Sequence, residues 1–162
     1  MNKTMKKVFS FLSGLGIGGV FGAYWVGKNY DAHCAKLERD ADKFSVYYTS
    51  TLQWVKLYQS GKTSVNYFKN KGYKTIAVYG INDLAKLLMN DIKESDVEIL
   101  YGIDRNADNL FLEMKCYRPD EKLPQVDVCI VALPDLYKDI SVTLSQGLSC
   151  PIVSIEDVVW ES

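Results

Sequence analysis

The spacing of hydrophobic and polar positions changes twice along this chain. The stretch 8–27 contains no charged residue. Over residues 31–59 apolar side chains recur in alternating steps of four and three, which predicts one face of a helix. After this helix, short apolar runs alternate with helical patterns, which predicts a mostly parallel sheet with right-handed crossovers. The pattern therefore divides the chain into 8–27, connecting helices over 31–72, and an α/β domain over 74–162.

The uncharged stretch 8–27 predicts a membrane-spanning helix. Its twenty residues, rising about 1.5 Å each, span roughly 30 Å, the hydrocarbon thickness of a bilayer. Lys7 and Lys28 flank it, and Tyr24 and Trp25 lie where aromatic residues gather at a membrane interface. A secretory signal peptide fits less well, because no small-x-small cleavage site follows. We therefore expect a single-pass protein of the cell membrane, with the following domain in the cytoplasm.

Glycines within this stretch bear on self-association. Gly14, Gly18 and Gly22 are four residues apart, a spacing that lets two helix backbones approach closely. Glycine is also common in membrane helices in general. A homodimer in the membrane is therefore one alternative, and a single helix is the other.

The connecting helix has an apolar face in which Thr51 is the one polar interruption. The members of this face are Leu37, Ala41, Phe44, Tyr48, Val55 and Tyr58. We expect the face to pack on the domain that follows, and a parallel coiled coil that continues a membrane dimer is the alternative. Gly61 ends the helix, and Thr63 or Ser64 caps a shorter one that Gly72 closes.

The α/β domain is expected to contain five strands and three helices. The strands are 75–79, 97–103, 112–117, 128–133 and 151–155, and the helices are 83–94, 134–147 and 155–160. The run 128–133 is the most apolar and predicts a central strand buried on both faces. We therefore expect an α/β fold: a small Rossmann-like parallel sheet, preceded by a transmembrane helix and a long amphipathic helix.

Composition narrows the chemistry that the chain can perform. Its 19 basic and 20 acidic residues give a net charge of −1, so no basic surplus favours nucleic acid. The four cysteines are widely spaced without a metal-binding motif, and they favour a reducing compartment over a disulfide framework. His33 is the only histidine, which excludes His-rich metal sites and most histidine-based catalysis. We therefore expect neither catalytic residues nor a metal site.

The segment KTIAVYGINDLA, residues 74–85, carries the clearest functional signal. Gly80 follows the first strand and makes a tight turn into a helix, as at the start of a dinucleotide-binding βαβ unit. In the GxGxxG pattern, however, Asn82 replaces the second glycine and Ala85 the third, and Asp83 places a negative charge where a phosphate would lie. These substitutions argue against tight dinucleotide binding. The alternative is a purely structural pair, with Asn82 as N-cap and Asp83 in the first turn.

Three further residues follow the ends of strands and are candidates for ligand binding. Asp104 ends the second strand, twenty-four residues after Gly80, close to where an acidic residue binds a ribose hydroxyl. Pro134 and Asp135 follow the most apolar strand near the expected crevice, although Asp135 also suits a helix N-cap. A bound cofactor would therefore contact Gly80, Asn82, Asp83, Asp104, Pro134 and Asp135.

Between residues 74 and 159 the chain resembles the Rossmann-like N-terminal module of bacterial nucleoside-diphosphate-sugar epimerase-like and sugar O-acyltransferase-associated proteins. The matching segments are IAVYGINDLAKLL, LYGIDRNAD, VDVCIVALPD and CPIVSIEDVV, where relatives carry YGxGxLG in the first. The N-terminal GLGIGGVFGAYWVGK resembles Gly-rich membrane anchors of small proteins from Gram-positive bacteria. The resemblance implies binding of a UDP-sugar, as in the acyltransferase relatives, or of NAD, as in the epimerases. It does not imply turnover, because nothing here matches their catalytic half.

We therefore expect a membrane-anchored, non-catalytic module that binds a nucleotide or nucleotide-sugar and serves envelope polysaccharide metabolism. One alternative is a degenerate Rossmann-like structural or interaction protein with no small-molecule ligand. Another is an NAD-dependent nucleotide-sugar enzyme of the epimerase type, for which the sequence places no acid or base.

Overall fold

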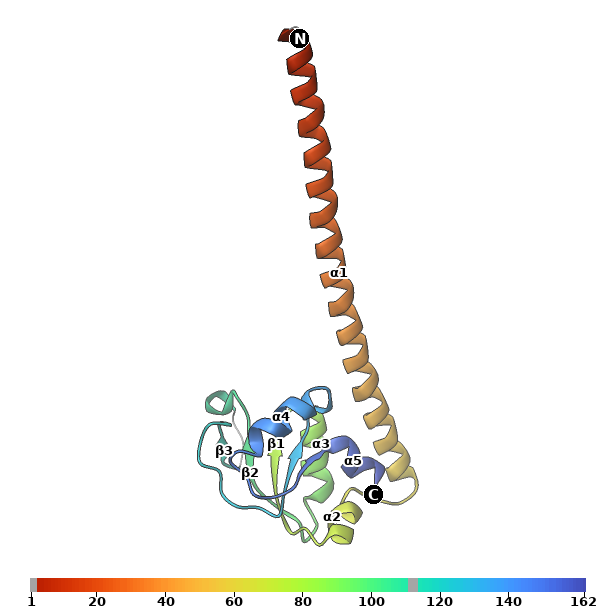
Figure 1. Cartoon of the computed structure of the whole chain (residues 1–162). Coiled ribbons are helices and arrows are strands. Elements are labelled where there is room, and N and C mark those ends of the chain that lie inside the picture. The colour runs from red at the N-terminus through yellow and green to blue at the C-terminus, as the bar shows by residue number, and fades with distance from the viewer. Residues whose placement is uncertain (1–2, 111–113) are drawn as a thin grey trace. The chain divides into compact units, whose positions relative to one another are not determined.

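The computed structural model describes residues 3–110 and 114–162, with side chains from residue 25 onward (Figure 1). It divides into two compact units, Met1–Lys43 and Phe44–Ser162. Helix α1 (Lys3–Gln59) begins in the first unit and ends in the second. The two successive helices expected near the N-terminus are therefore one element in the backbone.

Among the residues whose side chains the structure describes, no helix is both long and apolar enough to cross a membrane. Most of the predicted span, residues 8–24, lies outside this part of the chain. The structure therefore gives the transmembrane helix no support, and the span stays a prediction from the sequence.

The second unit is built on a sheet of five parallel strands in the order β3-β2-β1-β4-β5. The strands are β1 (Thr75–Tyr79), β2 (Glu98–Ile103), β3 (Cys116–Tyr117), β4 (Val128–Val131) and β5 (Ile152–Ser154). The expected α/β fold with a Rossmann-like parallel sheet is confirmed. Of the expected strand 112–117, β3 contains Cys116 and Tyr117, whereas residues 111–113 lie outside the described residues.

Helices cover both faces of this sheet, because successive side chains of a buried strand point to opposite faces. Ile76 and Val78 of β1 share a core cluster with residues of α1, α2, α3 and α5, whereas Ala77 and Tyr79 share one with α4. Figure 1 shows α3 and α4 on opposite sides of the strands. The helices are α2 (Val65–Lys71), α3 (Asp83–Ile92), α4 (Tyr137–Leu144) and α5 (Ile155–Trp160), with short 3-10 turns η1 (Ala107–Asn109) and η2 (Pro134–Leu136).

The end of α1 packs within the second unit through side chains outside its predicted apolar face. Ser50, Trp54 and Leu57 are buried. Phe44 and Tyr48, which belong to the predicted face, are 75% and 68% exposed. The expectation that this face packs on the following domain is therefore wrong for Phe44 and Tyr48, since periodicity identifies an apolar face without identifying what covers it.

The start of α2 differs in detail from its prediction. Ser64 occupies the N-cap position, but its side chain does not cap α2; its backbone N–H and its hydroxyl both donate to Asp91 Oδ2 of α3. Gly72 closes α2 with a φ of +75°, as predicted. The serine therefore joins two helices instead of ending one.

Asp127 joins the beginnings of β1 and β4. Its Oδ2 accepts the backbone N–H groups of Lys74 and Thr75, both at 2.8 Å. These bonds, that of Thr75 foremost, hold the pKa of Asp127 below its ordinary value of 3.8. Because the pKa is lower in the folded state, the charged carboxylate stabilises the fold above about pH 4, and this contribution is lost as the pH falls through the lowered pKa.

We expect the Asp127→Asn variant to be less stable than the parent near neutral pH, and the difference to shrink below about pH 4. Urea unfolding followed by circular dichroism, from about pH 6 down to about pH 2, measures this difference. Asp96→Asn, at an exposed position, is the matched control. A difference between Asp127→Asn and parent that stays constant over this range would contradict the prediction.

Candidate functional site

The sheet order places a topological switch point between β1 and β4. From β1 the chain continues through α3 on one face to β2, and from β4 it continues through α4 on the other face to β5. Open α/β sheets bind their ligands in the crevice beyond the carboxyl ends of the two strands that diverge in this way. Gly80, Asn82, Pro134 and Asp135 all follow these two strand ends, so the structure brings most of the predicted site residues to this edge.

Gly80 makes the turn that the sequence predicts. Its φ is +83°, in the left-handed region that favours glycine, and its N–H donates to Ile103 O at 2.8 Å. A Cβ at this position would lie 2.9 Å from Cγ and Cδ1 of Leu133. The space beside Gly80, which admits a ligand in dinucleotide-binding folds, is therefore filled by a side chain from the loop after β4.

Asn82 spans the switch point. As the N-cap of α3, it accepts the N–H of Ala85 at its Oδ1 at 3.0 Å, which confirms the predicted capping role. Its Nδ2 donates to Ala132 O at 2.6 Å, at the end of β4, and to the Tyr47 hydroxyl at 3.1 Å. The side chain thus occupies the place where a glycine would let a pyrophosphate approach the backbone.

Asp83 points away from this crevice. Its side chain is 97% exposed and forms a 3.0 Å ion pair with Lys86, one turn along α3. A charge so exposed is screened by water. Closure of the crevice therefore rests on Asn82 and Leu133 more than on repulsion from the Asp83 carboxylate.

Asp104 lies at the end of β2, beside the turn after β1. Its Oδ2 accepts the N–H of Ile81 at 3.0 Å, and its Oδ1 accepts the N–H of Asn106 at 2.8 Å. Both carboxylate oxygens therefore hold loops of the fold. Each oxygen has a second lone pair, so the same carboxylate retains the capacity to accept a hydroxyl.

Asp104 also lines a small cavity of about 110 Å³ next to Gly80. Its other lining residues are Tyr79, Arg105, Leu133, Leu136 and Ile140. Sites for small molecules usually enclose roughly 300–1,000 Å³. In a dinucleotide-binding fold, the adenosine ribose of the ligand would lie at this place. The cavity is smaller than such a ligand needs.

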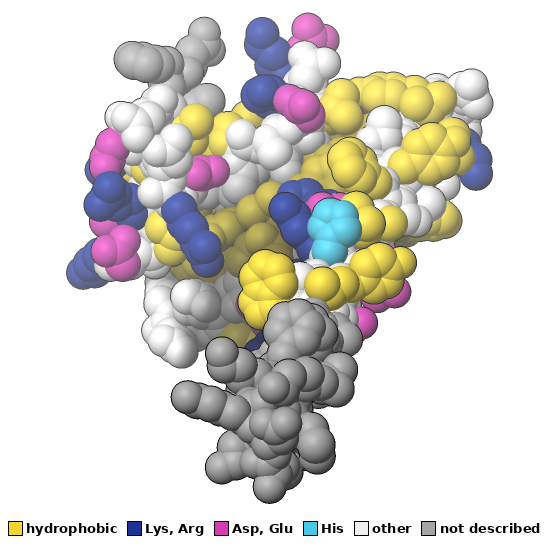
Figure 2. Space-filling view, turned by 90° about the horizontal axis from the view of Figure 1, so that it is seen from above, with side chains coloured by type: hydrophobic (Ala, Val, Ile, Leu, Met, Phe, Trp, Pro, Cys, Tyr) yellow, Lys and Arg dark blue, Asp and Glu magenta, His cyan; other side chains and the backbone are white. Residues whose placement is uncertain are grey.

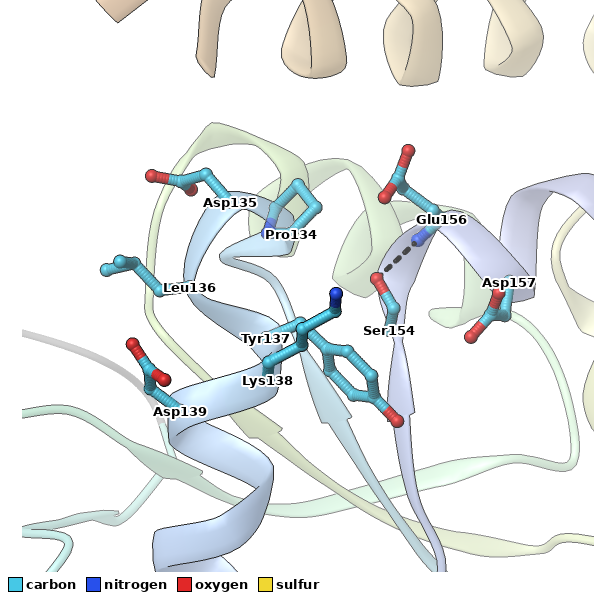
Figure 3. Close-up of a pocket in the computed structure, with 9 residues that line it drawn as sticks. All are labelled: Pro134, Asp135, Leu136, Tyr137, Lys138, Asp139, Ser154, Glu156 and Asp157. Atoms are coloured by element: carbon cyan, nitrogen blue, oxygen red, sulfur yellow. Dashed lines mark hydrogen bonds between the residues drawn. The ribbon is translucent and has the colours of Figure 1, made fainter. Parts of the chain in front are cut away.

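A larger pocket, of about 460 Å³, opens beyond the ends of β4 and β5 (Figure 3). Pro134 and Asp135 lie in η2 on one side, and Ser154 and Glu156 at the start of α5 on the other. Ser154 is the N-cap of α5, and its Oγ accepts the N–H of Glu156 at 3.3 Å. Asp135 lies in the first turn of η2 and is not an N-cap, so that alternative from the sequence is wrong.

This larger pocket is acidic. Its lining contains the carboxylates of Asp135, Asp139, Glu156 and Asp157, and Lys138 is the one basic side chain among the lining residues. Figure 3 shows the Lys138 side chain between the two groups of carboxylates. Burial, followed by the negative charge of Asp157, raises the pKa of Glu156. Such an excess of negative charge disfavours a phosphate-bearing ligand.

Tyr47 is a residue of this edge that the sequence analysis missed. Its hydroxyl accepts from Asn82, and burial, then the charge of Asp135, raises the pKa of the phenol. Tyr47, Ser50, Trp54 and Leu57 follow steps of three and four along α1. This second, shorter periodic set is the pattern in the sequence that indicates a buried face of the helix.

The described residues offer no metal centre: no group of three or more His, Cys, Asp or Glu side chains among them could hold an ion. Comparison of the chain with family models, with curated proteins and with solved structures gives no match. The resemblance to epimerase-like and acyltransferase-associated modules therefore remains a prediction from the motifs.

Proposed function

We propose that this protein is a non-catalytic interaction module with a Rossmann-like domain, and that its switch point serves the fold instead of a dinucleotide. The observation that carries the proposal is the Asn82 side chain, which joins the start of α3 to Ala132 O at 2.6 Å across the crevice. Leu133 adds to this by filling the space beside Gly80. To bind here, a dinucleotide would have to break the hydrogen bond from Asn82 to Ala132 O and displace the Leu133 side chain.

The proposal includes a membrane tether formed by residues 8–27. The support is the uncharged stretch of twenty residues between lysines, whose length matches the hydrocarbon core. A tethered module without a ligand of its own acts by the surfaces that it presents to other chains. The exposed apolar side chains on α1 are the surface best suited to that role.

Thermal melting of the full chain in a mild detergent tests the proposal. NAD, NADP, a UDP-sugar and coenzyme A are each added at millimolar concentration, and we expect none of them to raise the midpoint. A ligand present at about 100 times its dissociation constant would stabilise the fold by roughly 2.7 kcal/mol, which is easily detected. The Asn82→Gly variant, which restores the missing glycine, is the matched comparison.

A second candidate function is the nucleotide-binding module expected from the sequence. It is favoured by one observation: Asp104 and Gly80 line the same cavity at the ends of β1 and β2. A raised midpoint in the parent that Asp104→Ala abolishes would support this function and overturn our proposal. A rise seen only in Asn82→Gly would instead support closure of the crevice by Asn82.

A further inference from the structure

Apolar side chains that the fold leaves uncovered recur along α1 at the spacing of a coiled coil. They are Tyr30, Cys34, Leu37, Ala41, Phe44, Tyr48 and Val55, with Thr51 as the polar member, and we call them the α1 seam. Alternating steps of four and three place them at the d and a positions of consecutive heptads. Within the first unit Tyr30 is 68% exposed, and within the second Phe44 is 75% and Tyr48 68% exposed. Exposed hydrophobic side chains, in yellow, are prominent on the face drawn in Figure 2.

The seam does not compete with the packing of the second unit. The buried residues Ser50 and Leu57 occupy c positions, away from the seam. Trp54 occupies a g position that borders the seam, and its burial still leaves Phe44 and Tyr48 exposed. Beyond Val55 the seam ends, because Tyr58 lies beside Asp91 of α3, whose carboxylate raises the pKa of the Tyr58 phenol. Residues 30–55 of the helix can therefore meet a partner without unfolding the domain.

We infer that the α1 seam binds the same seam of a second copy of this chain, as a parallel, in-register, two-stranded coiled coil over residues 30–55. The first argument is area. Aromatic side chains bury about 150–250 Å² each, so the exposed parts of Tyr30, Phe44 and Tyr48 supply roughly 400 Å² per chain. With Leu37 and Val55 added, two chains bury about 1,000 Å², the area that a specific interface needs.

The second argument is charge. In a parallel coiled coil, a g residue of one helix lies beside the e residue five positions later in the other. Three resulting pairs are Val26 with Asp31, His33 with Glu38, and Asp40 with Ser45. The next g residue, Tyr47, turns instead to Asn82 of its own domain. None of these pairs brings two like charges together, and one pairs the chain's only histidine with a carboxylate. The acidic residues beside the seam, Asp31, Glu38 and Asp40, are therefore compatible with parallel pairing.

Cys34 provides a direct test, because at an a position it would face Cys34 of the second copy. We expect mild oxidation of the full chain in detergent, with copper phenanthroline, to yield a disulfide-linked dimer in which two thiols lose two protons and two electrons to the oxidant. The Cys34→Ser variant should not form this disulfide-linked dimer. In the Cys34→Ser background, Ala41→Cys, another a position, should restore the cross-link, and Arg39→Cys, at an outward f position, should not.

The effect on affinity is measured by light scattering or analytical ultracentrifugation of the full chain. We expect the mass of two chains for the parent, and a dissociation constant raised about 100-fold or more in Phe44→Glu, since each chain then loses a buried aromatic. Thr49→Glu, at an exposed b position, is the control that should stay dimeric. Equal cross-linking at positions 39 and 41, or a single-chain mass for the parent, would overturn the inference.

The inference rests on the proposed function in naming the partner of the α1 surface, and its outcomes are distinguishable from those of the ligand test. The seam shares no residue with the lining of either strand-end pocket. A nucleotide that raises the melting midpoint would defeat the proposed function and leave the dimer standing. A dimer that survives Phe44→Glu but is lost in Gly18→Leu, Gly22→Leu would place association in residues 8–27 and defeat this inference.

Discussion

Replacing Trp54 by alanine is expected to lower the free energy of unfolding by about 3–5 kcal/mol. Trp54 is 2% exposed and belongs to the core cluster that also contains Phe68, Ile76 and Leu88. Its removal would leave a cavity between the end of α1 and the sheet, which the neighbouring side chains could fill only in part. Urea unfolding of the full chain, followed by circular dichroism at 222 nm, measures the loss.

Two substitutions control this experiment. The indole N–H of Trp54 has no hydrogen-bond partner within the described structure, and a buried unpaired donor costs about 1–3 kcal/mol. Trp54→Phe should therefore lose much less stability than Trp54→Ala, because the smaller ring removes that donor. Lys56→Ala, two residues along at an exposed position outside the α1 seam, should change stability by about 0.5 kcal/mol or less. If Trp54→Ala proved as mild as Lys56→Ala, the end of α1 would not belong to the folded unit.

Trp54 is buried and its neighbour Val55 is 45% exposed, and this contrast shows what the sequence could not predict about α1. Two sets of apolar residues follow steps of three and four along this helix, one through Phe44 and Tyr48 and the other through Tyr47 and Trp54. Periodicity finds both sets but does not say which one meets the sheet. That depends on packing against α2, α3 and α5, and α5 lies at the other end of the second unit in sequence.

The sheet was easier to predict. β1 and β4 are short runs of β-branched and other apolar residues, and each is followed by a turn and a helical pattern, so parallel pairing with right-handed crossovers follows from general rules. The shortest strand, Cys116–Tyr117, lies within the predicted strand 112–117, of which residues 114 and 115 are described and are not in the strand. It pairs only with β2, at the edge of the sheet, so little apolar burial marks it in the sequence.

The candidate site likewise contains features that the sequence predicts and contacts that it could not predict. The turn at Gly80 and the cap at Asn82 are local features, and the residues themselves predict them. The bond from Asn82 to Ala132 joins residues fifty positions apart, and that from Ile81 to Asp104 joins residues twenty-three apart. Such contacts require the register of three strands to be known. For this reason the sequence placed the residues at a common edge but could not show that they fill it.

Gly80→Ala is the variant expected to disturb this edge most. Alanine in the left-handed region costs about 1–2 kcal/mol by itself. Here the new methyl would also meet Leu133 at 2.9 Å, and overpacking of this kind adds about 1–3 kcal/mol. We therefore expect a total loss of about 2–5 kcal/mol in the free energy of unfolding, measured in urea as for Trp54.

Gly72 separates the two causes of that loss. Its φ is +75°, close to that of Gly80, but a Cβ there would meet nothing within 4 Å. Gly72→Ala should therefore report the backbone strain alone, about 1–2 kcal/mol. The remainder at Gly80 should disappear when Gly80→Ala is made in a Leu133→Ala background, where the obstructing side chain is absent. Equal losses at the two glycines, with no coupling to Leu133, would mean that the space beside Gly80 is open, and the case for a closed switch point would then rest on Asn82 alone.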